Sequence, residues 1–169
     1  MAKSKKRLPW YPAATAAENA ARLLPVLTEA FFEAGRGVTH SPPSIDDLHR
    51  LRLKVKRFRY TLELFRPCYG PGLEKRLEAL KQMQEHLGAM NDCQTASVLF
   101  GVEGAGELPD AGVLRRFLDA RLAEKQEAFL RHWQETFDAE GQLQWWTDYL
   151  KNTARRGGLR DAKVTKRPR

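Results

Sequence analysis

Residues 44–65 read SIDDLHRLRLKVKRFRYTLELF, a segment with the pattern of one amphipathic helix. Ser44, with Asp47 three residues later, has the spacing of a capping box at a helix start. Apolar residues then recur at helical spacing and lie within about 100° of one another on a helical wheel. They are Leu48, Leu51, Val55, Phe58, Leu62 and Phe65. We therefore expect a helix from Ser44 to about Phe65 that buries one face.

The polar side of this segment is strongly basic. Six of the twelve residues 49–60 are Lys or Arg, and no carboxylate lies between Leu48 and Leu62. At about 100° per residue, four side chains fall within an arc of about 80° beside the apolar face. We call these four the basic row: His49, Arg52, Lys56 and Arg59. The opposite flank carries Arg50, Lys54 and Arg57.

Two interpretations of the basic row compete. One is a solvated surface whose long side chains cover the edge of the core. The other is an anion site, because the like-charge pairs Arg52–Lys56 and Lys56–Arg59 each cost a helix roughly 0.2–0.5 kcal/mol. Only Glu63 could offset that cost within the segment. The row would be about 15 Å long, enough for several phosphates of a linear polyanion, which the pattern favours.

The rest of the chain predicts an all-α protein, since no segment alternates with the period of a strand. The expected fold is an antiparallel helical bundle of four long helices plus a short C-terminal helix. The first helix covers 13–35 and stops at Gly35 and Gly37. The others are 44–65, a helix from near Gly72, 109–137, and a short helix after Gly141. The expected domain limits are a flexible basic segment 1–10, one helical domain 11–153, and a disordered basic tail 154–169.

The net charge of +8 is unevenly distributed. Residues 1–7 carry +4 and residues 155–169 carry +6, while residues 8–154 hold 18 basic and 20 acidic groups. A general basic surface is therefore not expected on the body of the protein. No apolar run approaches the length of a membrane span, and the two cysteines have no metal-type spacing. We expect a cytoplasmic protein.

The pattern His49-x-x-Arg52-(x)3-Lys56-Arg57-x-Arg59-Tyr60, followed by Leu62-Glu63-Leu64-Phe65, resembles the CHAD family (conserved histidine α-helical domain). The segment from Leu77 through Leu87-Gly88 to Asn91-Asp92 is similar to that family's next helix. The resemblance covers 44–100. It implies an all-helical fold that binds inorganic polyphosphate in a basic groove without catalysis, at a cytoplasmic site such as a polyphosphate granule. It also implies which residues are polyphosphate ligands, namely His49, Arg52, Lys56, Arg57 and Arg59.

One departure from the family pattern bears on assembly. The usual family domain repeats this helical unit twice, each time with its own basic helix, whereas this chain has one. The chain thus resembles a half-length member. Either two chains pair as a homodimer that rebuilds the double bundle, or the chain is a shortened module with weaker binding.

Further candidates for polyphosphate contact are secondary: Lys54, Tyr60, Arg121, Lys125 and His132. The last three align on one side of the fourth helix and could form a second wall of the groove, although Glu124 and Glu127 nearby favour plain surface charge. Arg76 is expected to be solvated. No grouping of residues predicts a catalytic centre, a metal site or a cofactor. The alternative function is nucleic-acid binding through the basic helix and the tails, and a third is triphosphate hydrolysis.

Overall fold

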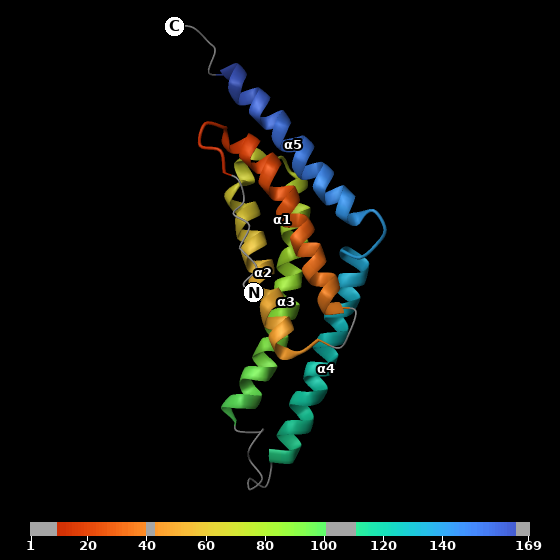
Figure 1. Cartoon of the computed structure of the whole chain (residues 1–169). Coiled ribbons are helices and arrows are strands. Elements are labelled where there is room, and N and C mark those ends of the chain that lie inside the picture. Colours follow the sequence, from red (N-terminus) through yellow and green to blue (C-terminus); the bar gives the residue numbers. More distant parts are fainter. Residues whose placement is uncertain (1–9, 40–42, 101–110, 165–169) are drawn as a thin grey trace, which may run out of the picture.

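The computed structural model describes residues 10–39, 43–100 and 111–164, with side chains described as far as Ala154. Within these ranges the chain is helical and has no strand, which confirms the all-α prediction (Figure 1). The α-helices are α1 (Ala16–Thr39), α2 (Ile45–Leu64), α3 (Gly72–Leu99), α4 (Ala111–Thr136) and α5 (Gln142–Val164). A short 3-10 helix, η1 (Arg66–Cys68), joins α2 to α3. Of the segment 1–10 that was expected to be flexible, residues 1–9 lie outside the described part.

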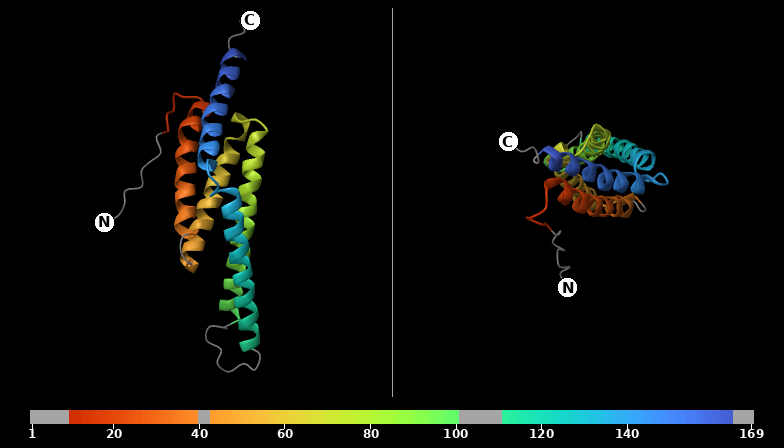
Figure 2. Two further views of the ribbon diagram at one scale, coloured as in Figure 1. Left: turned by 90° about the vertical axis from the view of Figure 1, so that its right-hand side faces the viewer. Right: turned by 90° about the horizontal axis from the view of Figure 1, so that it is seen from above.

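The helices form an elongated antiparallel bundle. Helix α1 packs against α2 and α5, α2 packs against α3, and α3 packs against α4. Helices α4 and α5 follow one another along the long axis, so that together they form the fourth side of the bundle (Figures 1 and 2). Helix α3 therefore separates α2 from α4 over the lower part of the molecule.

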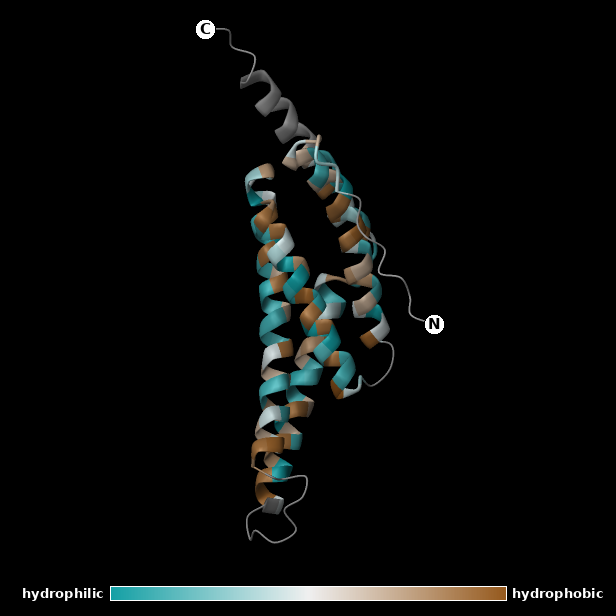
Figure 3. Ribbon diagram, turned by 60° about the vertical axis from the view of Figure 1, so that its left-hand side comes forward, coloured by the Kyte–Doolittle hydropathy of each residue, from teal (hydrophilic) through white to brown (hydrophobic). Residues whose placement is uncertain are grey.

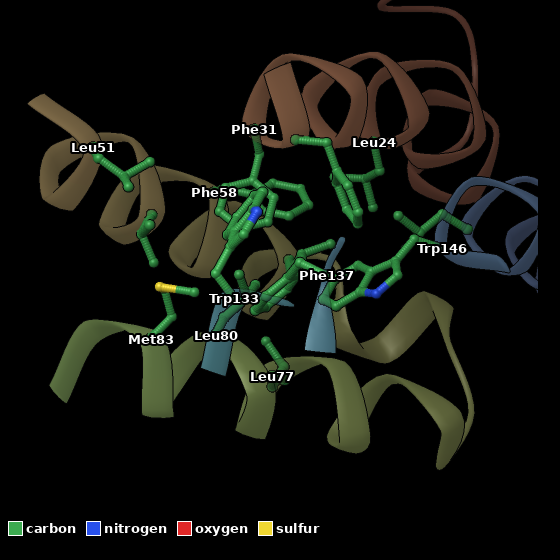
Figure 4. Packing of buried hydrophobic residues seen from close by; sticks show 14 of the residues in the cluster. Leu24, Phe31, Leu51, Phe58, Leu77, Leu80, Met83, Trp133, Phe137 and Trp146 are labelled. Atoms are coloured by element: carbon green, nitrogen blue, oxygen red, sulfur yellow. The ribbon is translucent and has the colours of Figure 1, made fainter. Parts of the chain in front are cut away.

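Aromatic side chains from four helices meet at the centre of the core (Figure 4). The ring of Phe31 on α1 stacks on that of Phe58 on α2, with centroids 5.2 Å apart. Trp133, near the end of α4, and Phe137, directly after α4, also stack at 5.2 Å. Trp146 of α5 lies 5.8 Å from Phe137. Because these rings come from elements far apart in sequence, the helices share one core.

The start of α2 follows the expected local chemistry. The hydroxyl of Ser44 accepts a hydrogen bond from the backbone N–H of Asp47 at 3.2 Å. The carboxylate of Asp47 in turn accepts from the backbone N–H of Ser44 at 3.2 Å. This reciprocal pair is the predicted capping box, and it holds two N–H groups that the first turn of a helix leaves without partners.

Two predicted helix ends are wrong. Helix α1 continues through Gly35 and Gly37 to Thr39. A Cβ atom on Gly35 would lie 1.8 Å from Cη2 of Trp133, so glycine allows that ring to approach α1 and does not end the helix. Helix α5 continues to Val164 and has 23 residues, so it is not short and overlaps the segment predicted to be disordered. Gly157 and Gly158 lower helix propensity by about 1 kcal/mol each without breaking the helix. Residues 165–169 lie outside the described part.

Candidate functional site

The basic row lies on the side of α2 that faces α3. On one flank of the apolar face, Phe58 stacks on Phe31 of α1, and Trp10 packs against Phe65 at 6.4 Å. On the other flank, Ile45 lines a pocket together with residues of α3 and α4. Ile45 shares its helical-wheel position with the basic row, since it is four residues before His49. The opposite flank, with Arg50, Lys54 and Arg57, is therefore nearer α1.

Three members of the basic row have no anionic partner in the described part of the chain. His49 is exposed, and Arg52 and Lys56 are partly buried. No carboxylate among the described residues lies within 4.0 Å of their nitrogen atoms. Because cationic side chains on neighbouring turns repel one another when no counter-charge is present, this part of α2 carries a concentrated and uncompensated positive charge.

Arg59, the fourth member, is in a different environment. Its Nη1 donates to Oε1 of Glu63 at 2.6 Å, one turn further along α2. Its guanidinium carbon also lies 4.7 Å from the centroid of the Tyr60 ring, in a cation–π contact. Its buried Nε has no hydrogen-bond partner among the described residues. One end of the basic row is thus compensated in the free protein, as the position of Glu63 in the sequence indicated.

On the opposite flank the three cations also differ. Arg50 pairs with Asp47 at 2.5 Å, and hydrogen bonds from Ser44 and then Arg50 lower the pKa of the Asp47 carboxyl. Lys54 and Arg57 are exposed and form no ion pair with any described residue. Between the two flanks Tyr60 is half exposed. The cations of α2 without an ion pair among the described residues therefore lie on both flanks of its apolar face.

Among the cations of α4, His132 lies against α3, whereas Arg121 and Lys125 pair within α4. The ring of His132 packs on that of His86 with centroids 5.1 Å apart, and its Nε2 lies 3.4 Å from the carbonyl oxygen of Ala79. Burial, followed by the nearby His132, lowers the pKa of His86. Arg121 and Lys125 both pair with Glu124, at 3.2 and 3.1 Å. Ile45 at the start of α2 lines a pocket with Leu118 and Leu122 of α4, so the two helices approach one another at that end. The role of Arg121, Lys125 and His132 as a second wall stays a prediction.

Arg76 is the charged residue that the sequence analysis placed wrongly. It is 2% exposed, and its guanidinium carbon lies 3.5 Å from the ring centroid of Trp145 and 3.8 Å from that of Tyr149. It donates hydrogen bonds to the carbonyl oxygens of Gly72 and Trp145. Burial lowers its pKa to about 10. The sequence contained a signal for this burial. Arg76 is three residues after Leu73 and four before Leu80, and it therefore lies on the buried face of α3.

Neither a metal-binding cluster nor a membrane-spanning helix is found among the described residues. No group of three or more His, Cys, Asp or Glu side chains among them is placed to hold a metal ion. No helix within the described ranges is both long and apolar enough to cross a bilayer.

The family model for the CHAD domain matches residues 2–101, and the chain therefore belongs to the CHAD family. The matched segment contains α1, α2 and α3, including the whole basic row. This domain is generally linked to polyphosphate binding and is generally a binding domain, not a catalytic one. Searches of curated proteins and of solved structures found no match to the chain.

Proposed function

We propose that the chain binds inorganic polyphosphate along the basic row of α2, without catalysing a reaction. The observation that supports this most directly is the absence of any carboxylate partner, among the described residues, for Arg52 and Lys56. Both belong to the segment matched by the family model. His49, Arg52 and Lys56 contact phosphates first in this proposal, and Arg57 and Arg59 contact them at the edges of the site.

The chemistry of these side chains suits a linear polyanion. Arginine presents a planar fork that binds two phosphate oxygens, while lysine acts as a compact point charge. A helix rises 1.5 Å per residue, so the row from His49 to Arg59 is about 15 Å long and spans several phosphates. Affinity should therefore rise with polymer length until the row is filled. Released counterions should make it fall steeply with salt concentration.

The secondary contacts in this proposal extend the row. Lys54 and Tyr60 lie on the exposed part of α2 and could meet a polymer that curves around the helix. Arg121, Lys125 and His132 of α4 lie outside the basic row and would contact a polymer that extends beyond it. Short polyphosphates should therefore be insensitive to substitutions on α4, whereas long ones could respond.

The test is a titration with polyphosphates of increasing length at two salt concentrations. The double variant Arg52→Ala/Lys56→Ala should lose roughly 10-fold to 100-fold in affinity. In a plot of log K against log salt concentration, its slope should be about one to two units less steep than that of the unaltered chain. The matched control is Lys75→Ala/Lys151→Ala, which removes two exposed cations from α3 and α5 and changes net charge equally. The control should retain affinity within about twofold. Equal losses in both variants would reject a defined site.

Two further arms address the alternatives. Competition with single-stranded and duplex DNA at equal phosphate concentration should leave polyphosphate bound, and stronger DNA binding would favour the nucleic-acid function. Incubation with tripolyphosphate and Mg²⁺ should release no phosphate. Phosphate release that depends on Arg52 or Lys56 would instead show that this site catalyses hydrolysis.

A further inference from the structure

The end of the α3–α4 hairpin extends past the ends of α1 and α2. Two views turned by 90° agree that, at this end, α3 and α4 continue beyond the other helices (Figures 1 and 2). In the body of the bundle α2 covers one side of α3, and α1 and α5 complete the core. Of the described residues, only those of α3 and α4 lie at the hairpin end, and two helices alone leave apolar surface in water.

Large apolar side chains are exposed there. We call them the end patch, and they are Val98, Leu99, Phe100, Val113 and Phe117. Their exposed fractions range from 58% to 76%. In Figure 3 the ribbon at this end is mostly coloured as hydrophobic. An apolar cluster at one end of a protein with 30% charged residues is a mark of an interaction surface.

A pocket of about 460 Å³ lies beside the end patch. Ile45 of α2 lines it, together with Val98 and Leu99 of α3 and Leu118 and Leu122 of α4. Its volume is within the range of sites that accept side chains or small ligands. This end of the molecule therefore has both exposed apolar side chains and a pocket. In a symmetric pair, the exposed side chains of one copy could enter the pocket of the other.

We propose that the end patch binds the end patch of a second copy of this chain in a two-fold symmetric dimer. Two such hairpin ends, packed face to face, supply four helices, the arrangement that covers the core in the body of the bundle. Beside the patch on α4, Arg115 and Asp119 form an exposed ion pair with each other at 3.9 Å, so both signs of charge are present. Both signs of charge on one surface allow each copy to pair with the other.

The area available fits a dimer of moderate affinity. Each side chain of the end patch exposes on the order of 100 Å². Two copies would then bury about 1,000 Å² from these side chains alone, which is near the lower limit for a specific interface. We expect a dissociation constant in the micromolar range. A membrane surface or an unrelated protein fits the end patch less well than a second copy, because the surrounding charges are mixed in sign and not of one sign.

The experiment measures mass by sedimentation velocity from about 1 to 200 µM protein, with no polyphosphate present. The full chain should pass from monomer to dimer over this range. Leu99→Glu and Phe117→Glu, made separately, should each weaken dimerisation at least 10-fold, because symmetry brings two new carboxylates together. Val26→Glu, at a half-exposed position of α1, is the matched control and should dimerise like the unaltered chain. Circular dichroism checks that every variant is helical.

Hydrogen exchange of the unaltered chain gives a second measurement that needs no variant. Amides of residues 94–100 and 112–118 should exchange more slowly at 200 µM than at 1 µM, while those of α1 should not change. A chain that stays monomeric at 200 µM overturns the proposal. So does a dimer that survives both patch substitutions, or one whose protected amides lie elsewhere.

Discussion

Glu63 occupies the place in the basic row that a further cation or a ligand phosphate could use. Its carboxylate accepts from Arg59 at 2.6 Å, and Tyr60 covers part of the same guanidinium. The pair is partly exposed, so its contribution to stability is small, within about 1 kcal/mol. For a polyanion, however, this carboxylate is a negative charge at the end of the site. It should repel the ligand and hold Arg59 away from it.

The variant Glu63→Gln should therefore bind polyphosphate more tightly, by about two- to fivefold, since one unit charge near 4 Å in water is worth about 1 kcal/mol. Binding of a short polyphosphate at low salt is the measurement, because salt screens the effect. Glu78→Gln on α3 makes the same charge change outside the row and should alter affinity less. Weaker binding by Glu63→Gln would instead show that Glu63 holds Arg59 in its binding position.

The buried guanidinium of Arg76 joins α3 to α5. It lies between Trp145 and Tyr149 and donates to two carbonyl oxygens, one of them on α5. The Arg76→Ala variant loses both hydrogen bonds and the ring contacts, which should lower the free energy of unfolding by about 2–4 kcal/mol. Urea unfolding followed by circular dichroism measures this change.

Lys75 is the control for that measurement, because it is next to Arg76, exposed, and without an ion pair among the described residues. Lys75→Ala should change stability by less than about 0.5 kcal/mol. If the two variants unfold at the same urea concentration, Arg76 does not anchor α5.

The sequence predicted the residues whose environment is local. The spacing of Ser44 and Asp47 predicted their capping box, and Glu63 was identified as the residue of the segment that could offset the basic charge. Both follow from helix geometry, which sets the partners within one turn. Arg76 was missed because a charged side chain is buried only when distant residues surround it. Trp145 and Tyr149, some 70 residues later in the sequence, supply that environment.

At the scale of helices, the same distinction explains the errors in helix ends. Gly35 was expected to end α1, since glycine favours helix termini. Its role depends instead on Trp133 of α4, whose ring occupies the space where a Cβ would be. Local sequence contains the propensity of glycine but not the neighbour that requires its missing side chain. The continuation of α5 past Ala154 to Val164 was also not predicted.

The pair Gly35→Ala and Gly88→Ala tests this explanation. Both residues lie inside long helices, where alanine normally stabilises by about 0.5–1 kcal/mol. Gly88 has nothing within 4 Å of an added Cβ, so Gly88→Ala should show that gain. Gly35→Ala should instead destabilise by about 1–3 kcal/mol, because its Cβ would lie 1.8 Å from Trp133. Thermal unfolding of both variants is the measurement, and stabilisation by Gly35→Ala would contradict the packing.

For the whole molecule, the segment matched by the family model is only part of the folding unit. Residues 2–101 include α1 to α3, but the rings of Phe31, Phe32 and Phe58 pack on Trp133, Phe137 and Trp146. Tyr69 also donates its hydroxyl hydrogen bond to the carbonyl oxygen of Leu150 on α5. The basic row is therefore held in place by a core that α4 and α5 complete, although neither helix contributes to the row itself.

The dependence of the basic row on that core predicts how truncated chains should behave. A fragment of residues 1–110 keeps the matched segment but loses the largest buried side chains, Trp133 and Trp146, so it should lose cooperative unfolding and bind the fluorescent dye ANS. A chain of residues 1–154 ends at Ala154, which is fully buried, and keeps every residue of the core. It should unfold cooperatively and retain binding of a short polyphosphate at high protein concentration. A sharp unfolding transition in the 1–110 fragment would show that three helices suffice, and that α4 and α5 cover a core that is already stable.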